Sequence, residues 1–161
     1  MKLHRGMVPV LYHGTSRARA ARILREGFKA SKHGHYLGHG VCLSECITVA
    51  YEHGAFEEGR VVLQVQLGGE TAWSDEAGGD IDVFLRTGPV AAVRLYWGNV
   101  WVIWPARVVA TVRALSREEA LATLEQRFAD HGQEVGYNGV VQQLADRYWS
   151  ARVAPASSIA P

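Results

Sequence analysis

Alternating and helical hydrophobic patterns divide the first part of the chain into a strand, a helix and a second strand. Residues 8–13 alternate in polarity and predict a strand that ends in a turn at Gly14. Ser16 is suited to cap an alanine-rich run with helical spacing, and Gly27 stands where a glycine commonly ends a helix. Residues 41–44 form the next apolar run. The pattern therefore predicts a strand, a capped helix and a strand in succession.

Further short elements are expected along the rest of the chain. Residues 29–40 are predicted to be a loop, because they are rich in glycine and histidine. Additional strands are expected at residues 59–67, 91–96, 100–104 and 108–115. Helical turns are expected at residues 48–53 and 82–85, the second within a polar loop over residues 68–88.

The C-terminal part predicts two helices. The run Ser116-Arg117-Glu118-Glu119 fits a capping box, in which a serine hydroxyl and a glutamate carboxylate bond each other's backbone amides. It opens a helix to about residue 129, and residues 139–152 predict a second one. Many short strands with one early helix and two late ones indicate the α+β class. We expect a single domain over residues 1–153, followed by a flexible tail over residues 154–161.

Composition narrows the class of protein. Of the 161 residues, 48% are hydrophobic and 20% are charged, which is typical of a globular domain. The formal net charge is +1, so no overall field draws the protein to nucleic acid or to a membrane. A local basic face remains open, because Arg17, Arg19, Arg22 and Arg25 follow one another along the predicted early helix. That set is either a solvated helix face or a surface that contacts phosphates.

Cysteine usage and hydropathy bear on location. Cys42 and Cys46 are too few for a zinc site built from thiolates and do not resemble a disulfide framework, so we expect a reducing, cytoplasmic setting. The N-terminus lacks the pattern of a signal peptide, and no apolar run reaches membrane-spanning length. We therefore expect no membrane partner. Delivery as an effector, such as a bacterial toxin, is the alternative.

Histidines raise the question of a metal site. The candidates are His33, His35, His39 and His53. Metal ligands are normally held by short spacings on rigid elements, whereas three of these four lie on the glycine-rich loop. No metal site is predicted.

The order of motifs between residues 11 and 51 resembles that of the ADP-ribosyltransferase superfamily. The set comprises His13-Gly14-Thr15, an alanine-rich helix ending in Gly27-Phe28, Leu37-Gly38-x-Gly40-Val41-x-Leu43-Ser44, and Ala50-Tyr51. The branch typified by the poly(ADP-ribose) polymerases, with a His-Tyr-Glu triad, is the most similar. The resemblance covers about residues 9–115 and implies a split β-sandwich with a cleft for NAD.

The resemblance assigns roles to individual residues. His13 would hydrogen-bond a ribose hydroxyl of NAD, and Gly14 would hold the carboxamide of nicotinamide through its backbone, which a planar ligand can approach closely. Tyr51 would stack on the nicotinamide ring. The remaining positions that it places at the NAD site are Thr15, Ser44 and the loop over residues 29–40.

One departure from the family's pattern concerns the wall of the nicotinamide pocket. Cys42 stands where the family usually has a tyrosine. Tyr36 and Trp97 are the candidates to fill the space. Cys42 itself is not predicted to be a nucleophile, because no His-Asp pattern accompanies it.

A second departure concerns the charge that catalysis needs. Asn99 stands where the family has a glutamate that holds a ribose hydroxyl and stabilises the cationic ribose as nicotinamide leaves. Asparagine retains a hydrogen bond but brings no negative charge to that centre. Glu70 and Asp82 are candidate substitutes from the long polar loop.

Three functions follow from the resemblance. The first is mono-ADP-ribosyl transfer from NAD to a macromolecular acceptor, protein or nucleic acid, with His13 and Asn99 as the catalytic positions. The second is a catalytically silent module that binds NAD or ADP-ribose. The third is 2′-phosphotransfer from RNA to NAD on the same fold, which would use Arg17, Arg19 and Arg22.

Plainer interpretations of the same residues also stand. His13 alone is typical of a strand-end histidine whose ring bonds a backbone carbonyl, and Tyr51 alone of core packing. Gly38 and Gly40 alone are typical of turns. The ordered set of motifs favours a ligand site at His13.

Overall fold

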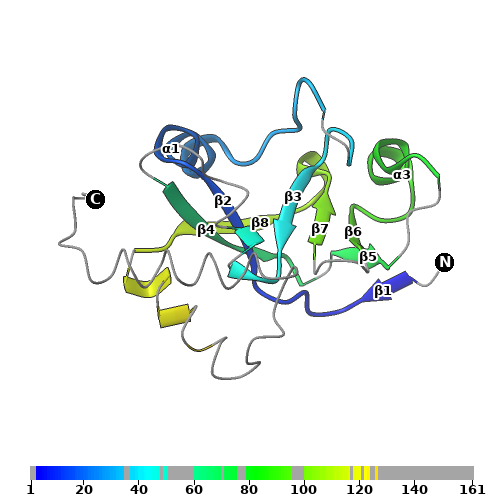
Figure 1. Ribbon diagram of the computed structural model, residues 1–161. Coiled ribbons are helices and arrows are strands. Elements are labelled where there is room, and N and C mark those ends of the chain that lie inside the picture. The colour runs from blue at the N-terminus through cyan, green and yellow to red at the C-terminus, as the bar shows by residue number, and fades with distance from the viewer. Residues whose placement is uncertain are drawn as a thin grey trace.

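The computed structural model is an α+β fold in which helices cover a mixed eight-stranded sheet (Figure 1). It describes residues 3–34, 37–47, 49–50, 60–69, 71–75, 79–95, 100–116, 118–120, 122–123 and 126. The α+β class expected from the sequence is confirmed. Among the described residues, no helix combines the length and apolar character needed to cross a membrane.

Eight short strands form one sheet in the order β1-β5-β6-β7-β3-β2-β4-β8. The strands are β1 (Leu3–Arg5), β2 (Leu11–Ser16), β3 (Val41–Ser44), β4 (Arg60–Leu67), β5 (Ala72–Ser74), β6 (Ala92–Leu95), β7 (Val100–Ile103) and β8 (Ala110–Ala114). The described helical elements include α1 (Arg17–Glu26), α3 (Ile81–Thr87) and the 3-10 turn η1 (Pro105–Arg107), and residues 118–120, 122–123 and 126 are also helical. Neighbouring strands are antiparallel, except that β5 and β6 are parallel.

The sheet is weakest in its middle, between β2 and β3. β2 pairs with β4 along its whole length, from Leu11 to Ser16, and β3 likewise pairs with β7 along its whole length. The two inner strands meet each other only at Tyr12 and Ser44. One group of strands (β1, β5, β6, β7 and β3) is therefore joined to the other (β2, β4 and β8) by one residue pair. We call this pair the joint.

Apolar packing holds the two groups together where backbone pairing does not. Leu11 of β2, Leu43 of β3 and Trp101 of β7 lie in one buried cluster, and each is at most 2% exposed. The next residue of β7, Val102, packs in a second cluster with Phe84 and Leu85 of α3. Successive side chains of a strand point to opposite faces, so β7 contributes to a core on each side of the sheet.

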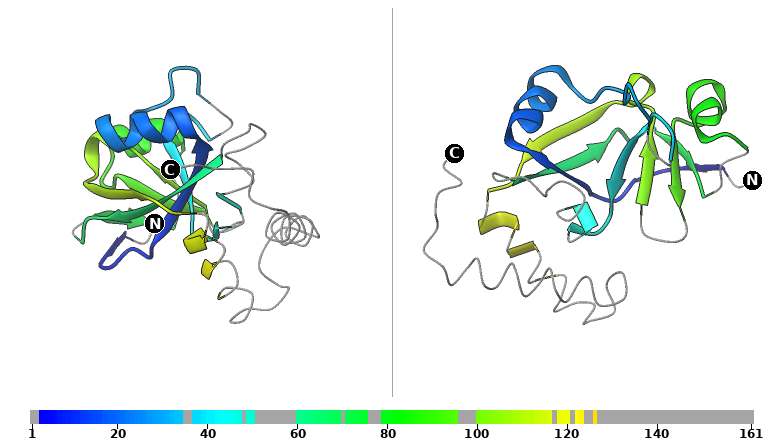
Figure 2. Two further views of the ribbon diagram at one scale, coloured as in Figure 1. Left: turned by 90° about the vertical axis from the view of Figure 1, so that its left-hand side faces the viewer. Right: turned by 45° about the horizontal axis from the view of Figure 1, so that its top comes forward.

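Helix α1 begins and ends as its sequence predicts. The backbone N–H of Arg19 donates to the Oγ of Ser16, which caps the first turn at 3.4 Å. Gly27 adopts a φ of 77° and donates its N–H to the carbonyl of Ile23. Ala20 is the side chain that α1 buries. In Figure 2 this helix lies along the end of β2, β4 and β8.

The capping box before the C-terminal helix is also confirmed. The N–H of Ser116 donates to the carboxylate of Glu119 at 2.8 Å, and the N–H of Glu119 donates to the Oγ of Ser116 at 3.1 Å. The described residues of the helix are 118–120, 122–123 and 126. The predicted end of this helix, the helix over 139–152 and the tail over 154–161 lie outside the described residues.

Three predictions of local structure are wrong. The first strand does not end at Gly14 but continues to Ser16, because Gly14 pairs with Val62 of β4. Residues 1–9, which the sequence suggests are a short basic lead-in, include β1. The region 68–88 includes β5 as well as the predicted helical turn, which extends to all of α3. β1 and β5 are only three residues long and pair with each other across about 70 positions, a contact that local sequence does not encode.

Gly40 packs closely against β7, and there is no space for a side chain at this position. A Cβ there would lie 2.7 Å from Cγ1 of Val102 and 2.9 Å from the carbonyl oxygen of Ile103. We predict that Gly40→Ala lowers the free energy of unfolding by about 1–3 kcal/mol, which corresponds to a fall in Tm of roughly 3–9 °C. Gly69→Ala is the matched control, because nothing lies within 4 Å of its Cβ. Equal melting temperatures for the two variants would contradict the packing described.

Candidate functional site

His13 joins the two groups of strands through its side chain. Its Nδ1 lies 2.9 Å from the carbonyl oxygen of Cys42, on the far side of the joint. A carbonyl only accepts, so Nδ1 carries the hydrogen, and in the neutral ring Nε2 is then an acceptor. The ring meets Phe28 edge to face, with 5.2 Å between ring centroids. The hydrogen bond and the aromatic contact together fix both the tautomer and the orientation of the imidazole.

Backbone pairing across the joint stops where His13 begins. Continued register would set His13 opposite Leu43 and Gly14 opposite Cys42, but β2 and β3 form neither pair. The N–H and C=O groups of successive residues point to alternate edges of a strand. Part of the β2 backbone beyond Tyr12 therefore faces β3, and the hydrogen bond from the His13 ring to the Cys42 carbonyl links the two strands there.

Two small hydroxyl side chains are buried near the joint. Thr15 is 4% exposed and Ser44 is 3% exposed. The Oγ of Ser44 accepts the N–H of Cys46 at 3.0 Å, which turns the chain out of β3. Ser44 thus has a local structural role in addition to any contact with a ligand.

Cys42 lies on β3 beside His13, but its thiol is not activated. Burial raises the pKa of Cys42 to about 11, from an ordinary value of 9.0. The side chain packs against the apolar cluster beneath α3. Its carbonyl oxygen is the acceptor for His13. Cys42 therefore contributes a backbone acceptor for His13 and a small side chain that packs in the apolar cluster.

The loop before β3 is fastened to α3 by Asp82. The backbone N–H of His39 donates to Oδ1 of Asp82 at 2.7 Å, and Nδ1 of His39 lies 2.6 Å from Oδ2. Burial acts to raise the pKa of Asp82, but hydrogen bonds from the ring and backbone of His39 and from the backbone of Gly40 outweigh it and lower the pKa. Gly38, at a φ of 89°, has no space for a Cβ beside this carboxylate. Asp82 thus anchors the loop, although the sequence suggested it as a substitute for the missing glutamate.

Glu45 was not singled out from the sequence, yet it lies directly after β3. One carboxylate oxygen accepts from Nε of Arg94 at 2.6 Å and from Nε1 of Trp101 at 2.8 Å. Ser44 pairs with Val100, so position 45 follows the last pair of the β3–β7 ladder at the end that adjoins position 99. One feature of the sequence could have pointed to Glu45: it is a carboxylate that directly follows the Leu43-Ser44 motif.

The structure thus brings together part of the set of residues expected from the sequence. His13 bonds the carbonyl of Cys42 next to the joint, and Gly14 follows His13 on β2. Ser44 is a member of the joint, and Thr15 lies farther along β2; both are buried. The other predicted positions, Tyr36, Tyr51, Asn99, Trp97 and Glu70, lie outside the described residues. No group of three or more potential metal ligands occurs among the residues that are described.

Comparisons with protein-family models, with curated proteins and with solved structures found no match to this chain. The chemistry of the joint is therefore argued from its own geometry.

A raised pKa makes Cys42 slow to react. An increase from 9.0 to about 11 lowers the thiolate fraction at pH 8 about a hundredfold, and the thiolate is the species that is alkylated. We predict that iodoacetamide modifies Cys42 in the folded protein about a hundred times more slowly than an unperturbed thiol, as followed by mass spectrometry of the peptides. Urea should remove the difference. Modification at the rate of a small-molecule thiol without urea would contradict this environment.

Proposed function

We propose that the chain has an ADP-ribosyltransferase-like split β-sandwich, binds NAD at the joint, and transfers a single ADP-ribose to a macromolecular acceptor. The observation that carries the proposal is the His13–Cys42 hydrogen bond, which links β2 and β3 just beyond their Tyr12–Ser44 pair. The histidine of this hydrogen bond belongs to the His-Gly-Thr motif that resembles the family's NAD-binding motif. Two independent features, one of sequence and one of backbone geometry, thus point to the same few residues.

The orientation of His13 suits a ribose hydroxyl. With Nδ1 donating to the Cys42 carbonyl, the neutral ring can accept a hydroxyl proton at Nε2. Phe28 restricts rotation of the ring by its edge-to-face contact. A histidine that is held in one tautomer before binding loses less entropy when the ligand arrives.

Gly14 suits the amide end of nicotinamide. A carboxamide has both a donor and an acceptor, as does the backbone of a strand residue. A glycine lets the planar ring approach the backbone without a side chain in the way. In this proposal the ring lies between Gly14 of β2 and Cys42 of β3, and Tyr51 stacks on it. Cys42 leaves more space on its side than the family's tyrosine would.

The transfer breaks one bond and makes another. The bond between the nicotinamide nitrogen and C1′ of the ribose breaks, and its electron pair leaves with nicotinamide as the neutral product. An oxygen or nitrogen of the acceptor forms the new bond to C1′ and releases its proton to solvent. The residues of the chain bind and orient, with His13 on the ribose and Gly14 on the leaving group.

The transfer would be faster with a negative charge near the ribose, which stabilises the developing positive charge. Asn99 supplies none, and Glu45, the carboxylate directly after β3, is shared between Arg94 and Trp101. A guanidinium that bonds a carboxylate offsets much of its charge. We therefore propose slow, single transfer in place of chain elongation.

The same facts favour a second candidate, a silent module that binds NAD or ADP-ribose. The specific observation is the pairing of Glu45 with Arg94, which offsets the charge of the carboxylate that directly follows β3. RNA 2′-phosphotransfer is less favoured. Arg17, Arg19 and Arg22 are all exposed along α1, and a phosphate-transfer site needs them to converge on one group.

His13→Phe tests the proposal. Phenylalanine keeps a ring against Phe28 but removes both nitrogen atoms. We predict that NAD raises the Tm of the wild-type protein and that His13→Phe weakens NAD binding about tenfold, or ~1.4 kcal/mol, as measured by calorimetric titration. Nicotinamide release, followed by chromatography, should fall at least as much.

The matched control is His4→Phe. This change also removes a histidine hydrogen bond, to Asp75, but at β1 on the outer edge of the sheet. It should leave NAD affinity within twofold of wild type. NAD binding without nicotinamide release in the wild type would favour the silent module over the enzyme, and absence of NAD binding would overturn both.

A further inference from the structure

Positive charge is concentrated in one segment of the chain. Residues 17–34 contain six lysine or arginine residues and one carboxylate, that of Glu26. This segment carries a net charge of +5, so the remaining 143 residues carry −4 to give the total of +1. A nearly neutral protein therefore has one strongly basic region.

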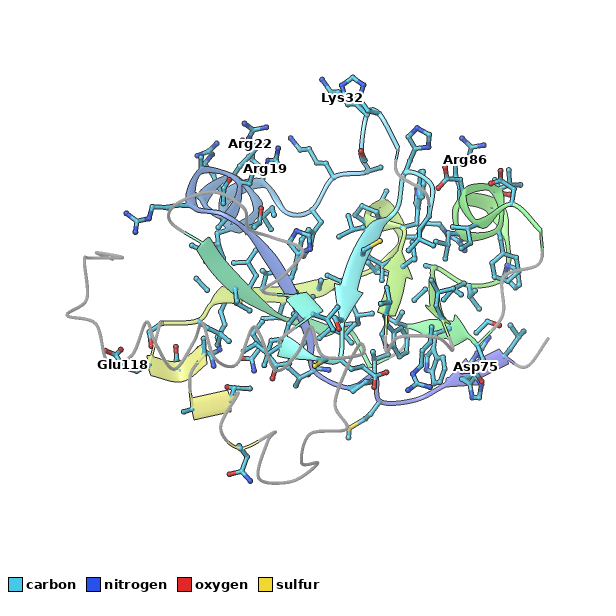
Figure 3. The ribbon with its side chains drawn as sticks, in the orientation of Figure 1. Arg19, Arg22, Lys32, Asp75, Arg86 and Glu118 are labelled. Carbon is cyan, nitrogen blue, oxygen red and sulfur yellow. The ribbon has the colours of Figure 1, made fainter. Side chains whose placement is uncertain are left out.

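The structure displays this charge on one side of the molecule. Figure 3 shows Arg19, Arg22 and Lys32 along its upper side, together with Arg86 of α3, whereas the labelled acids Asp75 and Glu118 lie on the lower side. We call Arg17, Arg19, Arg22, Lys32 and Arg86 the basic face. All five side chains are exposed. Among the described residues, no carboxylate forms an ion pair with any of them.

The acidic side chains of the same region form hydrogen bonds with groups outside the basic face. Glu26 accepts from Lys29 at 2.6 Å and from Arg25 at 2.7 Å, and these hydrogen bonds lower the pKa of Glu26 to about 2. Asp82 bonds His39, and the carboxylate of Asp80 caps α3 by accepting the N–H of Val83. None of these three carboxylates forms an ion pair with a residue of the basic face.

Helix stability does not explain the placement of these arginines. The first turn of a helix favours acidic side chains, because its N–H groups carry partial positive charge. The first turn of α1 has no acidic residue and instead carries Arg17 and Arg19. Like charges placed against the helix dipole cost stability, which is typical of residues that serve a ligand.

We propose that the basic face binds the phosphate backbone of a nucleic acid and that this nucleic acid is the acceptor of ADP-ribose. The inference rests on the proposed function of the joint. α1 starts at Arg17, four residues after His13 on the same continuous stretch of β2 and α1. Its ten residues span about 15 Å. That length matches about four nucleotides at ~3.4 Å per step.

The chemistry of the face favours nucleic acid over other polyanions. Four of its five cations are arginines, whose planar guanidinium groups bond phosphate oxygens in pairs. A helix that binds membranes turns a broad apolar side outward, whereas Leu24 is the single large apolar side chain that α1 exposes. Cations spaced along a helix and a loop match the repeating charge of a backbone. In the transfer, a base or sugar atom of the bound strand forms the bond to C1′ and loses a proton, while nicotinamide leaves.

The direct test is binding without NAD. Fluorescence anisotropy would follow the binding of fluorescein-labelled DNA and RNA strands of about 20 nucleotides, and of their duplexes. The salt concentration would run from about 25 to about 200 mM, because affinity that comes from phosphate contacts falls over this range. We predict that the binding constant falls steeply with salt. Arg22→Glu should reduce the slope of log K against log salt by about one unit and weaken binding at least about fivefold.

Arg5→Glu is the matched control. It makes the same change of charge at an exposed residue of β1 and should alter binding less than twofold. Equal loss in the two variants, or no binding to any strand at the lowest salt, overturns the inference. So does tighter binding to anionic vesicles or polyglutamate than to the strands.

A second measurement separates this inference from the proposed function. With NAD labelled in its adenylate part, the label should appear on the oligonucleotide and diminish in Arg22→Glu, while nicotinamide release without oligonucleotide should be unchanged in that variant. Nicotinamide release with no label on a bound strand overturns the acceptor and leaves the proposed function intact. Absence of NAD binding to the wild type overturns the proposed function, and the acceptor with it.

Discussion

The single pair between Tyr12 and Ser44 is the constraint on which the rest of the structure depends. β2 and β3 are paired along their whole length with β4 and β7, respectively, and share one pair in register with each other. A short interruption in the middle of a sheet leaves backbone groups that need partners. The imidazole of His13 supplies one of them by bonding the Cys42 carbonyl across the gap in pairing.

Apolar packing allows this interruption to persist. Leu11, Leu43 and Trp101 form one buried cluster across the joint, so the strands cannot drift apart even though few backbone bonds link them. Asp82 then holds the preceding loop in place through His39. These contacts hold the chain on both sides of the joint. The carboxylate of Glu45, directly after β3, is paired with Arg94.

Local signals in the sequence were enough for the parts of the fold that local contacts determine. The caps of α1 at Ser16 and Gly27, and the capping box at Ser116, are each made within a few residues and were found correctly. β1 and β5 were missed because three-residue strands take their stability from distant partners. Of the predicted site residues, the structure describes His13, Gly14 and Cys42 near the joint, and their roles toward a ligand stay predictions. Asp82 bonds His39, which is 43 positions away along the chain. Glu45 bonds Arg94 and Trp101, which are 49 and 56 positions away. No local pattern in the sequence reveals contacts at such separations.

Hydrogen exchange with and without NAD, followed by mass spectrometry, tests the central claim most directly. If NAD bonds the open edge between β2 and β3, saturating NAD should slow amide exchange in residues 13–16 and 41–44 and leave β1 and β5 unchanged. The same experiment on His13→Phe should show less slowing. Unchanged exchange in both segments at an NAD concentration that raises the Tm would place the ligand elsewhere and contradict the account.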